Sequence, residues 1–303
     1  MSRNDELQNA LASNFMLVDM QLRSWSGNKT DKAASRELIA AKSAVRDSGA
    51  FHKKLLASAD LELKAVHTEG NAMRMYVYDH TLPWSASDGA KRGERVLATT
   101  KALHFLGELN NLKKGHDDAV IKLASVWDQR VNEALQNLGG LADRSDYPSA
   151  SEVAGLFAVS VDLKPIPAIS DFSRLNVPAE LAAALSARYA ASASVQVQNA
   201  MDDLRDRFIG ELQRIETQMS KVAVGEKTRL YDTLITNMQT LVDMAKHMNL
   251  TGNPKLEELV ARIEAKVISR PVDHYKGNQV QARILADDAK QLALEAAMEE
   301  VWN

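Results

Sequence analysis

Basic side chains are concentrated between positions 23 and 54, where their spacing would suit binding to phosphate groups. Eight basic residues stand there against three acidic ones. At about 100° per residue on a helix, Lys32, Arg36 and Lys42 fall on one side, and Leu38 and Val45 on the other. Such a basic face can follow a phosphate backbone, and an aromatic ring beside it can stack on bases. The candidate nucleic-acid contacts are Arg23, Trp25, Lys29, Lys32, Arg36, Lys42, Arg46, Lys53 and Lys54.

The same pattern has a plainer interpretation. Any amphipathic helix on a globular protein needs a solvated face, and lysine and arginine often supply it. The chain as a whole is weakly acidic, with a formal net charge of −3, which argues against a general nucleic-acid coat. The basic stretch therefore fits nucleic-acid contact, a protein interface or ordinary surface.

A second group of residues has the spacing of a helix–helix interface. These apolar side chains recur at steps of three or four residues, with an average step of about 3.57, between a heptad repeat and a straight helix. A long partner helix is needed to bury them. The helix predicted at 94–138 has the matching length, so an antiparallel hairpin is the economical arrangement, although a second chain could also supply the partner. This seam consists of Val197, Met201, Leu204, Phe208, Leu212, Ile215, Met219 and Val222.

The residue types that carry catalysis are absent or badly spaced. The chain has no cysteine, which excludes thiol nucleophiles, disulfides and thiolate metal sites. Its histidines form no pair three or four residues apart, as metal sites on helices require. Segment 26–30 resembles a phosphate loop, but Asn28 separates Gly27 from Lys29. We predict no catalytic residue, no cofactor and no metal; an acid–base pair assembled from distant segments leaves no local pattern in a sequence.

Three short segments alternate between apolar and polar residues and are predicted as strands. They lie at 15–25, 73–78 and 159–163. We expect them to pair in one small sheet, because isolated strands are unstable. The other periodic segments are predicted as helices. The predicted helices lie at 30–45, 51–67, 94–138, 149–157, 178–222, 228–248, 254–268 and 279–302.

These elements predict a mainly α protein, an elongated helical bundle with a long antiparallel coiled-coil-like hairpin and a small three-stranded β-sheet. The aromatic share of 5% and the seven prolines agree with long helices. We expect an N-terminal region at 1–90 with the basic helix and short strands. The hairpin and the third strand follow at 91–225, and C-terminal helices at 226–303. No linker composition separates these regions, so one continuous elongated domain is expected.

The composition and the first residues indicate a cytoplasmic protein. Residues 1–6 are polar and acidic, whereas a signal peptide begins with a basic patch and an apolar run. No segment approaches the roughly 18 uninterrupted apolar residues of a transmembrane helix. We therefore expect no contact with a membrane.

Four short segments carry a resemblance to known proteins. They are Trp25–Lys29 after the first strand, 147–153 at the start of a short helix, 161–167 with Asp171-Phe172 behind it, and 248–257. Together they resemble a family of uncharacterised phage and integrative-element proteins, often encoded beside a cobaltochelatase-like AAA ATPase and a von Willebrand A-type protein. The resemblance implies an accessory or adaptor role in the bacterial host cytoplasm, with the AAA ATPase as a possible partner. It carries over no catalytic residue.

We therefore expect a non-enzymatic phage or mobile-element accessory or scaffold protein. It would self-associate, or bind a protein partner, through its long helices. The alternative is a DNA-binding or recombination accessory protein that uses the basic face of the N-terminal helix. An enzyme whose site is assembled from distant segments is the third alternative.

Overall fold

Helices dominate the computed structural model, which describes residues 3–45, 48–56, 60–85, 93–172, 174 and 176–302. The chain forms two compact units, each assembled from segments that are distant in the sequence. Unit 1 consists of Met1–Met20, Val77–Phe105 and Val161–Asn303, and unit 2 of Gln21–Tyr76 and Leu106–Ser160.

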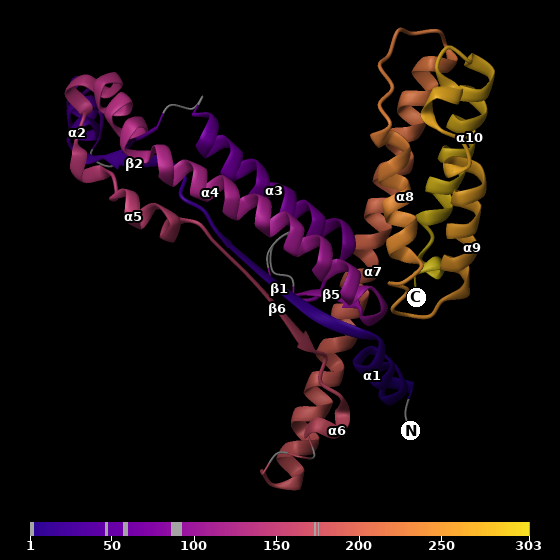
Figure 1. Cartoon of the computed structure of the whole chain (residues 1–303). Helices are drawn as coiled ribbons and strands as arrows, with labels where there is room; N and C mark the ends of the chain where they lie inside the picture. The colour runs from indigo at the N-terminus through magenta and orange to yellow at the C-terminus, as the bar shows by residue number, and fades with distance from the viewer. Residues whose placement is uncertain are drawn as a thin grey trace. The chain divides into compact units, whose positions relative to one another are not determined.

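The described elements can be followed by colour in Figure 1, where most of them are also labelled. The helices are α1 (Arg3–Asn14), α2 (Lys32–Ala41), α3 (Leu61–His80), α4 (Ala102–Leu138), α5 (Ala150–Val153), α6 (Ile169–Phe172), α7 (Ala179–Ala223), α8 (Thr233–Ala245), α9 (Pro254–Ile263) and α10 (Gln279–Ala296). The strands are β1 (Phe15–Arg23), β2 (Asn28–Asp31), β3 (Phe51–Lys54), β4 (Leu82–Pro83), β5 (Arg95–Ala98) and β6 (Ala158–Pro165). Within these described helices, none combines the length and the apolarity that spanning a bilayer requires.

The prediction of a single three-stranded sheet is wrong. The strands form a four-stranded sheet in the order β4-β5-β1-β6 and a separate two-stranded sheet of β2 and β3. Strand β5 pairs antiparallel with β1, where Phe15 lies opposite Ala98, and with β4, where Leu82 lies opposite Val96. All four residues of β5 are buried. A short strand buried on both faces shows no alternation, so its pattern could not be separated from that of the helix that follows.

The segment 73–78, predicted as a strand, lies in α3 instead. Its alternation is part of a longer helical pattern, because Leu63, Val66, Met73 and Val77 are all buried and recur at helical spacing. Gly70 stands inside this helix, where a Cβ atom would lie 3.1 Å from Leu22 Cδ2. The glycine therefore serves close packing and does not end the helix.

The seam lies at the centre of the core of unit 1. All eight of its side chains are at most 7% exposed. Helix α10 packs along α7 more extensively than any other described element, and α8 also packs against α7; Figure 1 shows both beside the C-terminal half of α7. The seam is thus buried by α8 and α10, and the expected hairpin of 94–138 with 178–222 is not what covers it. Most of helix α4, from Leu106 onward, belongs to unit 2.

Trp302 closes the core of unit 1 near the end of the chain. Its ring centroid lies 6.0 Å from that of Phe208 on α7. Its indole Nε1 donates a hydrogen bond of 2.7 Å to the carbonyl oxygen of Ala296. A buried tryptophan whose N–H is satisfied stabilises both through its area and by fixing the end of α10.

The core of unit 2 is built around Trp127 on α4. This side chain is fully buried, and its ring meets that of Trp25 edge-on at a centroid distance of 5.4 Å. Its Nε1 donates to the carbonyl oxygen of Pro148 at 2.9 Å. Gly27 turns the chain from β1 toward β2 at φ +68°, and a Cβ atom there would lie 3.1 Å from Leu63. A glycine is therefore required in this turn.

Candidate nucleic-acid interface

The two-stranded sheet of unit 2 presents the basic helix α2. Strands β2 and β3 pair antiparallel, with Lys29 opposite Lys53 and Asp31 opposite Phe51. Asp31 ends β2 and caps α2, because its Oδ1 accepts hydrogen bonds of 3.0 Å from the amides of Ala33 and Ala34. A carboxylate at this position also interacts favourably with the positive end of the helix dipole. The same residue thus ends the strand and starts the helix.

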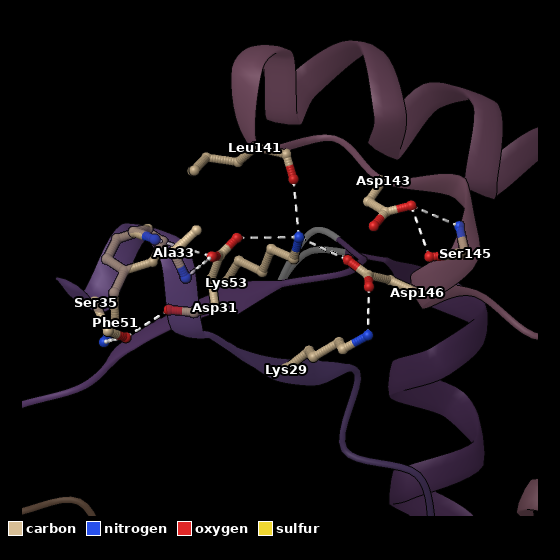
Figure 2. Close-up of polar contacts among 11 residues, drawn as sticks. Lys29, Asp31, Ala33, Ser35, Phe51, Lys53, Leu141, Asp143, Ser145 and Asp146 are labelled. Carbon is tan, nitrogen blue, oxygen red and sulfur yellow. Dashed lines mark hydrogen bonds and ion pairs between the residues drawn. The ribbon is translucent and has the colours of Figure 1, made fainter. Parts of the chain in front are cut away.

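Lys53 joins this sheet to the segment that follows α4. Its Nζ lies 2.6 Å from Asp146 Oδ2 and 3.2 Å from Asp31 Oδ2, and donates to the carbonyl oxygen of Leu141 at 2.9 Å. Lys29 pairs with the other oxygen of Asp146. Figure 2 shows the two lysines converging on this carboxylate. The Lys53 cluster, meaning Lys29, Asp31, Lys53 and Asp146, therefore clamps the β2–β3 sheet to residues 141–146.

The cluster is shielded from solvent at its centre. The side chains of Lys53 and Asp146 are 6% and 4% exposed. Burial would raise the pKa of Asp146, but hydrogen bonds from Lys29 and Lys53 outweigh it and hold the pKa below its usual value. The backbone N–H of Ala34, and then Lys53, lower the pKa of Asp31. The hydrogen bond to Asp146 raises the pKa of Lys53. Asp31, Lys53 and Asp146 are therefore charged at neutral pH.

Four of the predicted nucleic-acid contacts thus have partners within unit 2. Lys29 and Lys53 belong to the Lys53 cluster. Arg23 donates to the carbonyl oxygen of Gly155. Trp25 is half-buried against Trp127. Stacking of Trp25 on a base would require its ring to leave this contact, so these four residues build the scaffold beneath the basic surface.

Four other predicted contacts are exposed. Lys32, Arg36 and Lys42 lie on or directly after α2, and Lys54 ends β3. Within the described part of the chain, none of the four takes part in an ion pair. Arg46 lies outside the described residues. The basic surface, meaning these four exposed residues, is the part of the prediction that the structure leaves accessible.

Helix α2 contacts the sheet through a different face from the one its sequence suggests. Ser35 is buried, and its Oγ accepts a hydrogen bond of 2.9 Å from the amide of Phe51. Ile39, one turn later, is half-buried. Leu38 and Val45, on the predicted apolar face, are 46% and 80% exposed. The helix therefore leaves most of its circumference open, with apolar and basic side chains side by side.

Asp146 is not among the residues predicted from the sequence. It lies 117 positions away from Lys29, and nothing in the sequence around it indicates a charged partner. Its neighbour Asp143 accepts hydrogen bonds from the amide and hydroxyl of Ser145, a local turn pattern that the sequence does contain. That pattern could have indicated an ordered turn, but not its charged partners.

Unit 1 holds a separate buried polar cluster. Arg207 pairs with Asp203 at 2.6 Å, donates to the carbonyl oxygen of Tyr78 at 2.8 Å, and lies 3.6 Å above the Tyr78 ring centroid. Arg95 donates to the hydroxyl and carbonyl oxygens of Thr81 at 2.6 and 2.7 Å. Burial lowers the pKa of Arg95 to about 10. Burial also raises the pKa of Asp203, against the opposing effect of Arg207 and Arg95.

This second cluster connects α7 to the strand pair β4–β5 and holds its charges in a network. Perturbed pKa values occur at catalytic sites, but equally in structural ion-pair networks. The described residues contain no group of three metal-ligating side chains. The basic surface of unit 2, by contrast, is exposed and can bind anions.

Comparison with known proteins gives no family to this chain. No family model matches it, and neither does any curated protein or solved structure. The resemblance to the phage and integrative-element family therefore stays a prediction.

Proposed function

We propose that this chain is a non-enzymatic accessory protein that binds the phosphate backbone of a nucleic acid through the basic surface. The observation that carries the proposal is the exposure of Lys32, Arg36, Lys42 and Lys54 without ion-pair partners in the described structure. The Lys53 cluster supports it, because paired lysines hold the sheet in place while unpaired ones face solvent. Phosphate contacts of this kind position a protein on nucleic acid without reading its sequence.

The number of accessible charges sets an expected salt dependence. Each phosphate neutralised on double-stranded DNA contributes about −0.9 to the slope of log affinity against log salt. Four contacts therefore predict a slope of about −3 to −4. Binding to nucleic acid through four phosphate contacts would be weak at physiological salt. Such weak binding fits an accessory protein that acts beside a protein with higher affinity. The resemblance to a phage and mobile-element family, with its neighbouring AAA ATPase, supports the same kind of role.

The seam, which was expected to be a possible site of self-association, is not available for binding a second chain. The eight seam side chains fill the core of unit 1, so another copy or a partner protein would have to bind elsewhere. A protein partner remains compatible with the accessory role. The nucleic-acid proposal does not depend on it.

Fluorescence anisotropy with labelled single- and double-stranded DNA tests the proposal over about 50 to 200 mM salt. The variant Lys32→Glu/Arg36→Glu/Lys42→Glu should abolish binding. The matched control changes three exposed lysines of α3 and α4, as Lys64→Glu/Lys114→Glu/Lys122→Glu, with the same change in net charge. The control should retain most of the affinity. Equal losses in the two variants, or no binding at low salt, would contradict a binding site on α2.

A further inference from the structure

Helix α10 and the residues directly after it expose a stripe of large apolar side chains on the side that faces away from α7. Val280, Ile284, Leu294 and Met298 are between 50% and 68% exposed. The opposite face, with Leu285 among its residues, is buried in the core of unit 1. The helix is therefore apolar on two sides, and only one of them is used within the chain.

Three of the exposed side chains lie on one line along the helix, and Met298 follows two residues after the helix ends. At about 100° per residue from Val280, Ile284 falls near 40° and Leu294 near −40°. From Val280 to Leu294 the rise is about 21 Å at 1.5 Å per residue. Asp287 and Gln291 lie between the two apolar pairs. The stripe thus has an apolar pair at each end and a polar centre.

The spacing of the stripe is symmetric about position 289. Val280 and Met298 are equally distant from that position, and so are Ile284 and Leu294. A second copy of α10 running antiparallel would therefore place Ile284 against the other Leu294, and Val280 near the end of the other helix, which Met298 follows. Asp287 would meet the amide of the other Gln291. A surface that matches itself under a two-fold rotation has the property required of a symmetric dimer interface.

Charges along the stripe favour the same arrangement. Asp287 and Lys290 are exposed and have no ion-pair partner among the described residues. An antiparallel pair brings Asp287 of one copy beside Lys290 of the other, twice. A parallel pair would instead place the two Asp287 carboxylates opposite each other, which is unfavourable. On the flank nearest α9, Glu295 pairs with Arg262, and Asp288 with Lys266 at 2.6 Å.

We propose that α10 forms an antiparallel pair with α10 of a second copy of this chain, with the two-fold axis near position 289. One helix pair of this length buries less than the roughly 1,600 Å² of a standard interface. The dimer should therefore dissociate in the micromolar range. This inference rests on the outer face of α10 alone and does not depend on nucleic-acid binding.

Sedimentation equilibrium of the full chain over a wide concentration range tests the dimer. The wild type should show a monomer–dimer equilibrium, and Ile284→Glu/Leu294→Glu should be monomeric throughout. Leu103→Glu is the matched control, since Leu103 is an exposed leucine at 87% and should leave the equilibrium unchanged. Circular dichroism checks that each variant is folded. A strictly monomeric wild type at high concentration would overturn the proposal, as would a dimer that the double variant leaves intact.

Disulfide trapping tests the register, because the chain has no cysteine of its own. A mixture of Val280→Cys and Met298→Cys chains should form a cross-linked heterodimer under mild oxidation. Each variant alone should cross-link much less, since an antiparallel pair holds identical positions apart. Efficient cross-linking of Val280→Cys with itself would contradict the antiparallel arrangement. Failure of the mixture to cross-link at concentrations where the dimer is populated would also overturn it.

Discussion

Replacing Lys53 by methionine should open the β2–β3 sheet. Methionine keeps much of the apolar stem but removes the ammonium group, which lies 2.6 Å from Asp146 and 3.2 Å from Asp31. Removing one partner of a buried ion pair costs about 3–5 kcal/mol. We expect the lower end of that range, about 3 kcal/mol, because Lys29 still reaches Asp146.

Hydrogen exchange with mass spectrometry is the suitable assay, because two units need not unfold together and a whole-chain midpoint would mix them. A loss of about 3 kcal/mol corresponds to about a 150-fold increase in local opening, at 1.36 kcal/mol per tenfold. That increase should appear in peptides covering β2 and β3. The matched control is Lys54→Met, the neighbouring exposed lysine, which should change protection little.

Two results would refute this reasoning. One is a change below about fivefold in Lys53→Met, which would mean that the cluster contributes less than about 1 kcal/mol. The other is an equal effect of Lys54→Met. The double variant Lys53→Met/Asp146→Asn should recover part of the loss, because the buried Asp146 carboxylate is then no longer left without the Lys53 ammonium group.

The remaining predictions concern pH and one buried hydroxyl group. The pKa of Asp146 is lowered in the folded state, so its stabilising contribution is present above the pKa of the unfolded chain and is lost as pH falls below about 4. Hydrogen exchange in β2 and β3, corrected for the intrinsic exchange rate, should therefore rise only below that pH. The pKa of Asp203 is raised, so its effect on stability has the opposite sign, and protection of α7 from hydrogen exchange should increase as pH falls toward about 4. In Asp203→Asn, protection of α7 should depend less on pH. Tyr147→Phe removes a 2.6 Å hydrogen bond to the carbonyl oxygen of Leu55 and should cost about 1 kcal/mol in unit 2, measured by exchange in peptides around Leu55. A fall in α7 protection on acidification, or an unchanged Tyr147→Phe variant, would contradict these assignments.

Local signals predicted several helix boundaries well. The seam predicted a helix at 178–222, and α7 spans Ala179–Ala223. A helix was predicted to begin at 254, and α9 does begin at Pro254, where Asn253 caps it through a hydrogen bond from the amide of Lys255. Ser149 and Glu152 form a capping box at α5. In each case the periodicity or cap lies within a few residues, so no distant partner is needed to detect it.

The candidate interface was predictable only in part. Its exposed residues lie on and next to one helix, whereas its buried residues depend on partners from distant segments. Lys32 and Arg36 are exposed as predicted, but so is Leu38 on the apolar face predicted opposite them. The burial of Lys53 depends on Asp146, which comes from a distant segment and has no local mark. The face of α2 that contacts the sheet depends on Ser35 and its hydrogen bond with Phe51. Apolar periodicity cannot predict a helix orientation that is fixed by a hydroxyl group.

The division of the chain into interleaved units has a consequence for synthesis on the ribosome. Every segment of unit 2 has been made once Ser160 is added, whereas unit 1 needs Val161–Asn303. Core residues of unit 1 such as Leu11 and Trp84 pack in one cluster with the seam. They therefore emerge long before their partners on α7 and α10. Translation that stops early would release a chain with a completed unit 2 and uncovered apolar segments, which is a typical target for chaperones and proteases.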